Sequence, residues 1–525
     1  PGLVDGRLQV VTEKMPFPRG IVGINSFGFG GSNTHVILKP AMHEAKEPPK
    51  ADFMKIVVYS GRTTEAVMSI LDAVAADPEN VYFQQLLSNQ ANMPARDTPF
   101  RGYMIMHRDK IPVPVNAKRD PNLPPLKDIQ KIMITEPKQI YYIYSGMGTQ
   151  WPGMARQLMA IPVFNDSLKI ASAALDEYGL DVYKMLNSDD PSLYKNNTLN
   201  CMLAITAIQI ALTDVLTAMG IQPDGIIGHS TGEMGCGYAD GCLTREQTMK
   251  LAYHRGNSIM NGGIKVEGAM AAVGLSWEET KKRVPEGVVA ACHNAADSVT
   301  ISGDADKIEK FVEEMKKEDV FAKMVDSSGI PFHSPQMLKI KDVMLKAMRT
   351  VVPQPKQRSS RWISTSIPEA DWDNELAQTC SADYHTHNAC SPVLFYEALQ
   401  KIPANAVTVE IAPHCLLHAI LRRTLHKTCT NVGLLNMREK DRELEAFLQA
   451  LGKIYQTGVT IQISALYPQV QYPVPIGTPM ISPIWKWDHT QDWPVIDGKL
   501  MVSGGGGQVA STASYTVDPF APDSK

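Results

Sequence analysis

Short apolar runs alternate with longer helical patterns from about residue 137 onward. The run "QIYYIYSG" (139–146) predicts a buried strand, and 200–220 has the apolar pattern of a long helix that Gly220 ends. A second strand, "PDGIIG" (223–228), leads into another helical pattern, and 244–261 predicts a further helix. This order of strand, turn and helix predicts an α/β fold with a parallel sheet covered by helices, similar to that of the α/β-hydrolases.

The pattern changes between residues 268 and 327. Apolar alternation and amphipathic stretches follow one another there as strand, helix, strand, strand, helix, strand. This is the order of the ferredoxin-like split unit. Helical patterning resumes at "FHSPQM" (332–337), so we expect a ferredoxin-like subdomain inserted at about 267–330.

The segments on either side of this region predict one small domain and several shorter pieces. Residues 41–136 have the pattern of a small α/β domain, whereas 1–40 contain two strand-like runs around a glycine-rich turn and are too short for a core of their own. The turn lacks the Lys-Ser/Thr end of a phosphate-binding loop, so we interpret it as structural. A mixed helical stretch covers 436–466, and "SGGGGQ" (503–508) begins a flexible linker.

Composition narrows the class of protein. The chain has 525 residues, enough for two to four domains, with 44% hydrophobic and 20% charged residues and a net charge of −4. These values argue against a partner that is nucleic acid or an anionic membrane. The eight cysteines form no C-x-x-C pair, so we expect reduced thiols, no metal site and a cytoplasmic protein. No run of about 18 apolar residues and no signal peptide are visible.

One serine lies in a pattern typical of nucleophiles. Gly228-His229-Ser230-Thr231-Gly232 follows a predicted strand and opens a predicted helix, which is the turn that exposes a serine Oγ in α/β-hydrolases. The helix N-terminus would direct backbone N–H groups at developing negative charge. A serine with a purely structural role in a loop is the alternative. We interpret His229 as a packing residue, because a sharp turn directs it away from its neighbour.

Two further residues are candidates for the same site. His333 lies in "IPFHSPQM", where the chain leaves the predicted insert, and it is either the base for Ser230 or a structural histidine. Arg255 has apolar neighbours at Leu251 and Ile259, so its helix face is not plainly solvated. Its planar guanidinium matches a substrate carboxylate with two hydrogen bonds, and an internal Asp or Glu partner is the alternative.

The chain resembles a known family at several motifs. "YSGMGTQWPGM", "DGIIGHSTGEMGCGYADG", "YHRG", "ACHNAADSVTISG", "PFHS" and "EIAPH" are similar to the malonyl/acetyl transferase region of animal type I fatty acid synthase. The flanks resemble the neighbouring parts of that synthase. The resemblance implies the end of a ketosynthase at 1–40, a linker domain at 41–136, the acyltransferase at 137–435, a second linker at 436–495 and a run-in to a dehydratase at 496–525.

The resemblance also implies roles for individual residues. Ser230 would accept the acyl group, His333 would act as acid and base, and Arg255 would hold the malonyl carboxylate. The implied oxyanion hole consists of the backbone N–H groups of Met147 and Thr231. Asn388 would orient the histidine through its carbonyl, and the implied pocket residues are Gln150, Phe332 and Asn294. No bound cofactor is implied, because CoA thioesters and the phosphopantetheine of an acyl carrier protein are substrates.

Two departures from the family pattern leave the acyl group open. Thr231 stands where fatty acid synthases usually have Leu, and Ile330-Pro331 replaces the usual Met-Ala before the Phe-His pair. Malonyl, acetyl and methylmalonyl groups all remain candidates, the last as in related animal polyketide synthases. A serine thioesterase or hydrolase on the same elbow and a decayed, inactive scaffold are the rival functions.

Overall fold

The structure is a computed structural model that describes residues 54–90, 98–106, 127–132, 138–475 and 478–486, with 2–7, 9–10, 12, 20–28 and 31–39 near the start. It divides into two units, of which the smaller contains residues 1–48 and 470–478. In this unit, strands β1 (Val22–Phe27) and β2 (Asn33–Leu38) form an antiparallel hairpin. Gly28 N–H donates to the Ser32 carbonyl at 2.7 Å, next to the paired ends of the two strands.

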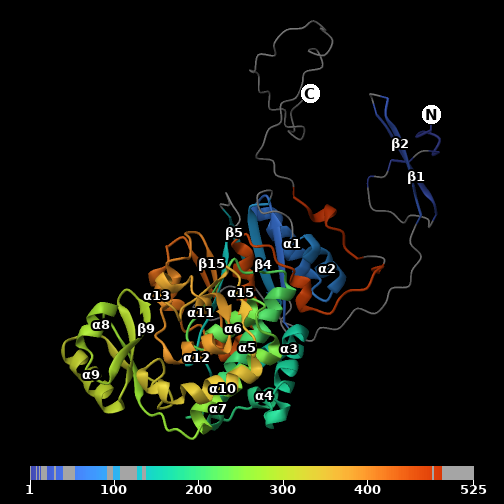
Figure 1. The fold of residues 1–525 in the computed structure, drawn as a ribbon. Coiled ribbons are helices and arrows are strands. Elements are labelled where there is room, and N and C mark those ends of the chain that lie inside the picture. The colour runs from blue at the N-terminus through green and yellow to red at the C-terminus, as the bar shows by residue number, and fades with distance from the viewer. Residues whose placement is uncertain are drawn as a thin grey trace. The chain divides into compact units, whose positions relative to one another are not determined.

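A five-stranded parallel sheet forms the centre of the larger unit (Figure 1). Its order is β13-β7-β6-β15-β16, and every neighbouring pair is parallel. All residues of β6, β7 and β15 are buried, as expected for a sheet with helices on both faces. The strands are β6 (Ile140–Tyr144), β7 (Gly225–Gly228), β13 (Trp362–Ile363), β15 (Val407–Ile411) and β16 (Thr430–Gly433).

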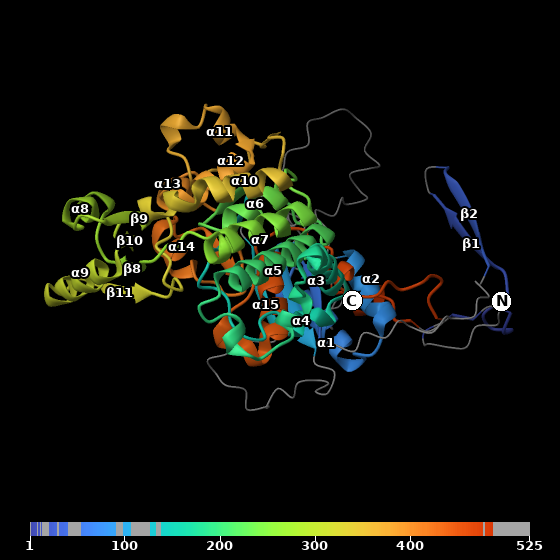
Figure 2. The same cartoon turned by 60° about the horizontal axis from the view of Figure 1, so that its bottom comes forward.

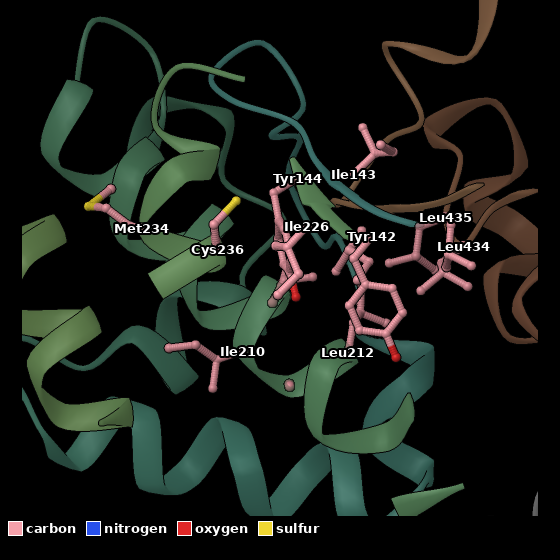
Figure 3. Close-up of a cluster of buried hydrophobic side chains, with 14 of the residues drawn as sticks. Tyr142, Ile143, Tyr144, Ile210, Leu212, Ile226, Met234, Cys236, Leu434 and Leu435 are labelled. Carbon is pink, nitrogen blue, oxygen red and sulfur yellow. The ribbon is translucent and has the colours of Figure 1, made fainter. Parts of the chain in front are cut away.

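Helix α5 (Thr198–Ala218) is the central helix of this core. It begins at Asn197, whose side chain accepts from Asn200 N–H, and it ends just before Gly220, which has a φ of +75°. The helix is long and apolar enough to cross a membrane, but 83% of the qualifying stretch is buried inside the protein, as in a core helix of a globular domain. Figure 3 shows the apolar side chains of α5, β6 and β7 gathered in one cluster.

Further helices pack against the sheet and against one another. Helix α7 packs against α5 and α10, and α10 in turn packs against α12 (Figure 2). Short strands β12 and β14 pair with each other at the periphery. These elements are α3 (Pro162–Ala173), α4 (Val182–Leu186), α6 (Gly232–Ala239), α7 (Arg245–Asn261), α10 (Lys341–Val351), β12 (Lys356–Gln357), α11 (Glu375–Gln378), β14 (Thr379–Cys380), α12 (Ala382–Cys390), α13 (Phe395–Leu399), α14 (His418–Thr424) and α15 (Glu443–Gln456).

The predicted ferredoxin-like insert is present. Its four antiparallel strands have the order β11-β8-β10-β9, and it has a hydrophobic core of its own. It joins the larger lobe through His293 N–H, which donates to the Val393 carbonyl at 2.8 Å. The insert comprises β8 (Ala269–Val273), α8 (Trp277–Arg283), β9 (Val288–Ala295), β10 (Ser298–Gly303), α9 (Ala305–Lys317) and β11 (Ala322–Val325).

A small α/β module precedes the central sheet. Strands β3 (Lys55–Gly61), β4 (Phe100–Met106) and β5 (Lys127–Lys131) form an antiparallel sheet that packs on α1 (Thr64–Ala76) and α2 (Val81–Gln90). Arg101 ties this module to α15, because its buried guanidinium donates to the carbonyls of Tyr455 and Val459 at 3.0 and 2.7 Å. The fold class predicted from the sequence is therefore confirmed, whereas the predicted flexible run-in at 496–525 lies outside the described residues.

Candidate active site

Ser230 lies on a tight turn between β7 and α6. Its φ is +55°, a left-handed conformation that is unusual for a residue other than glycine and is typical of the strand-turn-helix elbow. The glycines on either side make this turn sterically possible. A Cβ at Gly228 would lie 2.6 Å from Glu233 N, and a Cβ at Gly232 would lie 2.1 Å from the Tyr144 carbonyl oxygen. The turn therefore exposes the Ser230 side chain at the carboxyl end of the sheet.

Glu233 fixes the first turn of α6 behind the serine. Its carboxylate is fully buried and accepts hydrogen bonds from Trp362 Nε1 at 2.6 Å, from Thr365 N at 2.9 Å and from Thr365 Oγ1 at 2.8 Å. Sequence reasoning missed this residue, although a glutamate three positions after the serine, at the start of a helix, is a usable signal.

His333 is the partner of Ser230. Its Nε2 lies 2.7 Å from Ser230 Oγ, and its Nδ1 lies 2.9 Å from the Ser391 carbonyl oxygen. A carbonyl only accepts, so Nδ1 bears the proton and Nε2 is free to accept from the hydroxyl. Burial, and then the charge of Arg255, lower the pKa of His333 to about 3. The imidazole is therefore neutral at pH 7, the state that a base for serine requires.

The prediction that the Asn388 carbonyl orients the histidine holds only in a minor part, because the hydrogen bond from Nδ1 goes to the Ser391 carbonyl. The Nδ1 acceptor is Ser391, which caps the C-terminus of α12 three residues later, and the Asn388 carbonyl influences the pKa of His333 less than the Ser391 carbonyl does. The Asn388 side chain has a different function: its Oδ1 accepts from Arg255 Nη1, and its Nδ2 donates to Ser366 Oγ at 2.9 Å. The Asn388 side chain therefore orients the guanidinium, whereas the acceptor that orients the imidazole is the Ser391 carbonyl.

Arg255 projects from α7 into the protein interior and is fully buried. Its Nη1 donates to Asn388, but Nε and Nη2 have no partner among the described residues. Burial lowers the pKa of this guanidinium to about 10. Within the part of the chain that the structure describes, no carboxylate forms an ion pair with Arg255, so the predicted alternative of an internal acidic partner does not hold. A buried cation with two free donors is suited to a bidentate anion.

The loop after β6 lies against the serine turn. His229 N–H donates to the Tyr144 carbonyl at 2.8 Å, and a Cβ at Gly146 would lie 2.8 Å from the His229 carbonyl oxygen. Gly146, the residue before Met147, thus lies against the turn from His229 to Thr231. Neither backbone N–H has an acceptor in the described regions of the chain. Two such free donors beside a serine Oγ suit the oxygen of a tetrahedral intermediate.

A cavity of about 590 Å³ opens at Ser230 and His333, between the larger lobe and the insert. Phe332 and Asn294 line it, as the family resemblance implied, and Met147 lines it as well. His229 also lines it, with its Nε2 2.8 Å from Asn294 Oδ1, so its interpretation as a packing residue was incomplete.

Gln150 does not line this cavity. Its Oε1 accepts from Gly148 N–H at 2.9 Å and so closes the turn that directly follows Met147. The prediction of Gln150 as a pocket residue is therefore wrong, because the side chain folds back on its own loop.

Sequence comparison identifies the family. Residues 141–461, more than half of the chain, match the model of the acyl transferase domain, and residues 1–105 match the ketoacyl-synthetase C-terminal extension. The chain belongs to the acyl transferase family. Residues 141–461 are thus an acyltransferase domain of the kind found within multidomain synthases.

The relatives are fungal polyketide synthases. The chain is 28% identical over 503 residues to the highly reducing polyketide synthase sphB of Aspergillus fumigatus, which covers 88% of this chain and 18% of that protein. It is 30% identical over 514 residues to sdnO of Sordaria araneosa, with 90% and 16% covered. The chain thus spans about a fifth of the length of these relatives. The finer resemblance to animal fatty acid synthase is not supported by these relatives.

Solved structures of acyltransferase domains share the fold. The domain from module 8 of the salinomycin polyketide synthase superposes with a TM-score of 0.64 at 19% identity, covering 80% of this chain and 99% of that one. The acyltransferase domain of PpsC of Mycobacterium tuberculosis gives a TM-score of 0.50 at 25% identity, covering 56% and 91%. Both belong to polyketide synthases.

Proposed function

We propose that this chain transfers a malonyl group from CoA, through an ester on Ser230, to the phosphopantetheine thiol of an acyl carrier protein during polyketide synthesis. The observation that supports this most strongly is the buried Arg255 guanidinium, with two unpartnered donors, close enough to the Ser230–His333 pair to lower the pKa of His333. A serine–histidine pair suffices for acyl transfer, and the free guanidinium selects an acyl group that bears a carboxylate.

In the first half-reaction, Ser230 Oγ attacks the thioester carbon while His333 Nε2 takes its proton. A C–O bond forms, and the carbonyl oxygen becomes an oxyanion that the N–H groups of Met147 and Thr231 stabilise; one such donor is worth about 3 kcal/mol in serine enzymes. The C–S bond then breaks, and His333 returns the proton to the CoA thiolate. The Ser391 carbonyl holds the imidazole in the required tautomer throughout.

In the second half-reaction, the carrier thiol gives its proton to His333 Nε2 and attacks the seryl ester. The new C–S bond forms, the C–O bond breaks, and Ser230 regains its proton from His333. Transfer exceeds hydrolysis only where water is poorly placed at the ester. A carboxylate on Arg255 would hold the acyl group still during this exchange, which favours the thiol in the open cavity.

Methylmalonyl is the alternative acyl group, because polyketide synthases are the relatives and because two sequence departures adjoin the site. Thr231 has a buried hydroxyl without a partner among the described residues, and Ile330 is nearly buried beside Phe332. Neither residue is among those that line the cavity, so an effect on the choice of acyl group would be indirect. The cavity volume accommodates either acyl group.

Intact-protein mass spectrometry tests the proposal. The chain is incubated with malonyl-, methylmalonyl- and acetyl-CoA, and the mass of each adduct is measured for the wild type and for Ser230→Ala. We expect one malonyl adduct that Ser230→Ala lacks and that a holo acyl carrier protein removes as a thioester. Release as free malonate, indifferent to the carrier protein, would indicate a hydrolase. No adduct with any of the three thioesters would indicate an inactive scaffold.

A further inference from the structure

A buried carboxyl group that the mechanism does not use is hydrogen-bonded to two segments next to the active-site cavity. Glu410 is at the carboxyl end of β15, next to β6 in the sheet, and is only 1% exposed. Its Oε1 accepts hydrogen bonds from Ser145 Oγ at 2.7 Å and from Leu417 N–H at 2.8 Å. We propose that Glu410 is a positioning residue that fixes the Met147 N–H of the oxyanion hole, an inference that rests on the proposed acyl transfer.

Hydrogen bonds fix the loop that begins at Ser145 on both sides of Met147, at Ser145 and Gly146 before it and at Gly148 after it. The Ser145 side chain donates to Glu410, and the Ser145 carbonyl accepts from Gln209 Nε2 at 2.7 Å. The Gly146 carbonyl accepts from Thr149 Oγ1 at 3.0 Å. The Met147 N–H, two residues from Ser145, is left free for the substrate. Since oxyanion donors act only within about 2.7–3.1 Å of the oxyanion, small shifts of this loop reduce the rate.

The second hydrogen bond of Glu410 reaches another part of the cavity wall, where Leu416 lies next to Gly148. Leu417 follows Leu416 at the start of α14, and both leucines line the cavity that contains Ser230. One carboxyl oxygen therefore connects two loops, one with the oxyanion donor and one with an apolar wall. Without it, the Ser145 hydroxyl and the Leu417 N–H would be buried without an acceptor, which costs stability and allows both loops to shift.

The chemistry of Glu410 favours this function over a simple structural one. Its Oε2 has no hydrogen-bond partner within the described part of the chain, and burial raises its pKa to about 7. Burying a carboxyl group without a cation is unfavourable. If this position served only for packing, an apolar side chain would make the fold more stable. A carboxyl oxygen accepts hydrogen bonds from both the Ser145 hydroxyl and the Leu417 N–H, which a leucine side chain cannot do.

A second buried glutamate provides a matched control. Glu443 is 2% exposed, burial raises its pKa to about 7, and it accepts from Ala155 N–H at 2.6 Å and from Gln157 N–H at 3.3 Å. Neither it nor its donors line the cavity at Ser230. Removing Glu443 thus reproduces the loss of a buried bridging carboxyl without touching the oxyanion loop.

Rapid-mixing measurements of the CoA burst with malonyl-CoA test the inference. The variants are Glu410→Gln, which keeps Oε1, Glu410→Ala, Ser145→Ala, Glu443→Gln and Glu443→Ala. Because a displaced donor gives up part of the 10²–10³-fold effect of an oxyanion hole, we expect Glu410→Ala to slow acylation by about 30-fold and Ser145→Ala by about 10-fold. The concentration of malonyl-CoA at half-saturation should change by less than about twofold, since the ground state does not use this donor. Glu410→Gln should stay within about threefold of the wild-type rate, and both Glu443 variants should keep that rate.

The outcomes separate this inference from the proposed function. Where Glu410→Ala does not fold, Ser145→Ala decides, because it removes only one oxygen. An acylation rate of Ser145→Ala or Glu410→Ala equal to that of the wild type, with Ser230 still acylated, would overturn the role of Glu410 alone. An equal loss in Glu443→Ala would also overturn it, since the effect would then be general destabilisation. A wild-type protein that forms no adduct at Ser230 would overturn the proposed function instead.

Discussion

Replacing Arg255 with alanine should separate recognition of the acyl group from the chemistry at Ser230. The guanidinium offers two free donors, Nε and Nη2, in a fully buried position. A malonyl carboxylate would take both as charge-assisted hydrogen bonds. Removing one partner of a buried charge pair costs roughly 3–5 kcal/mol, which corresponds to a loss of about 150-fold to 4,000-fold in kcat/KM for malonyl-CoA.

The same substitution should leave acetyl transfer intact. An acetyl group has no carboxylate, so it loses no contact. The charge of Arg255 is the second-largest influence that lowers the pKa of His333, after burial. Its removal therefore raises the pKa of His333 and makes the imidazole a stronger base, so acetyl transfer should be unchanged or a few-fold faster.

The assay compares kcat/KM for malonyl-CoA and acetyl-CoA with a holo acyl carrier protein as acceptor, in wild type, Arg255→Ala and Arg255→Lys. Lysine keeps the charge but not the planar pair of donors, so its malonyl rate should lie between the other two. The Asn388 oxygen loses its donor in Arg255→Ala, so the melting temperature is measured as a control. Equal losses with both substrates, in a variant as stable as the wild type, would refute the reasoning.

Three further predictions follow from single observations. Because the pKa of His333 is lowered to about 3, its neutral form is present at all pH values above about 4. In rapid-mixing experiments, kcat/KM for acylation should therefore not fall as the pH is lowered through 6.5, and such a fall would contradict the assigned pKa. Gly232→Ala would place a Cβ 2.1 Å from the Tyr144 carbonyl oxygen, so we expect a lowered melting temperature and no CoA burst; a stable, active variant would show that the elbow can relax. The pKa of Glu410 is raised from 4.5 to about 7, so the folded state prefers the protonated form and wild-type stability falls as pH rises from about 4.5 to 7. Glu410→Gln avoids that loss, and urea unfolding should find it more stable than the wild type by about 3 kcal/mol at pH 8 and no more stable at pH 4; equal stability at pH 8 would contradict the raised pKa.

Sequence patterns predicted the parts of the fold that depend on local rules. The period of apolar residues identified β6, β7 and α5, and the glycines of the elbow identified its turn, because a Cβ at Gly228 or Gly232 would collide with backbone. The insert was predicted at about 267–330 for the same reason, since its six elements follow one another in the chain. Helix α5 was predicted as a helix and not as a membrane span, because polar residues interrupt its apolar run; these polar residues are buried in the core.

Contacts between distant segments were predictable only in part. The pairing of Ser230 with His333 and the inward position of Arg255 came from a family resemblance, because the chain separates them by up to 103 residues. The choice of Ser391 rather than Asn388 depends on where α12 ends, and helix ends are the least certain part of a sequence-based prediction. Gln150 differs for another reason: a side chain two residues from a free backbone N–H can bind its own loop instead of a pocket.

The positions of Arg255 and His333 link substrate recognition to basicity. In the free site, an unpaired buried cation lowers the pKa of the imidazole that must accept the Ser230 proton. A substrate carboxylate bound to Arg255 neutralises that cation, and the pKa of His333 should then rise. A malonyl thioester would thus strengthen its own base, whereas an acetyl thioester or a water molecule would meet the weaker one. Since proton transfer from serine limits acylation when the base is weak, this coupling favours carboxylated acyl groups in kcat as well as in KM.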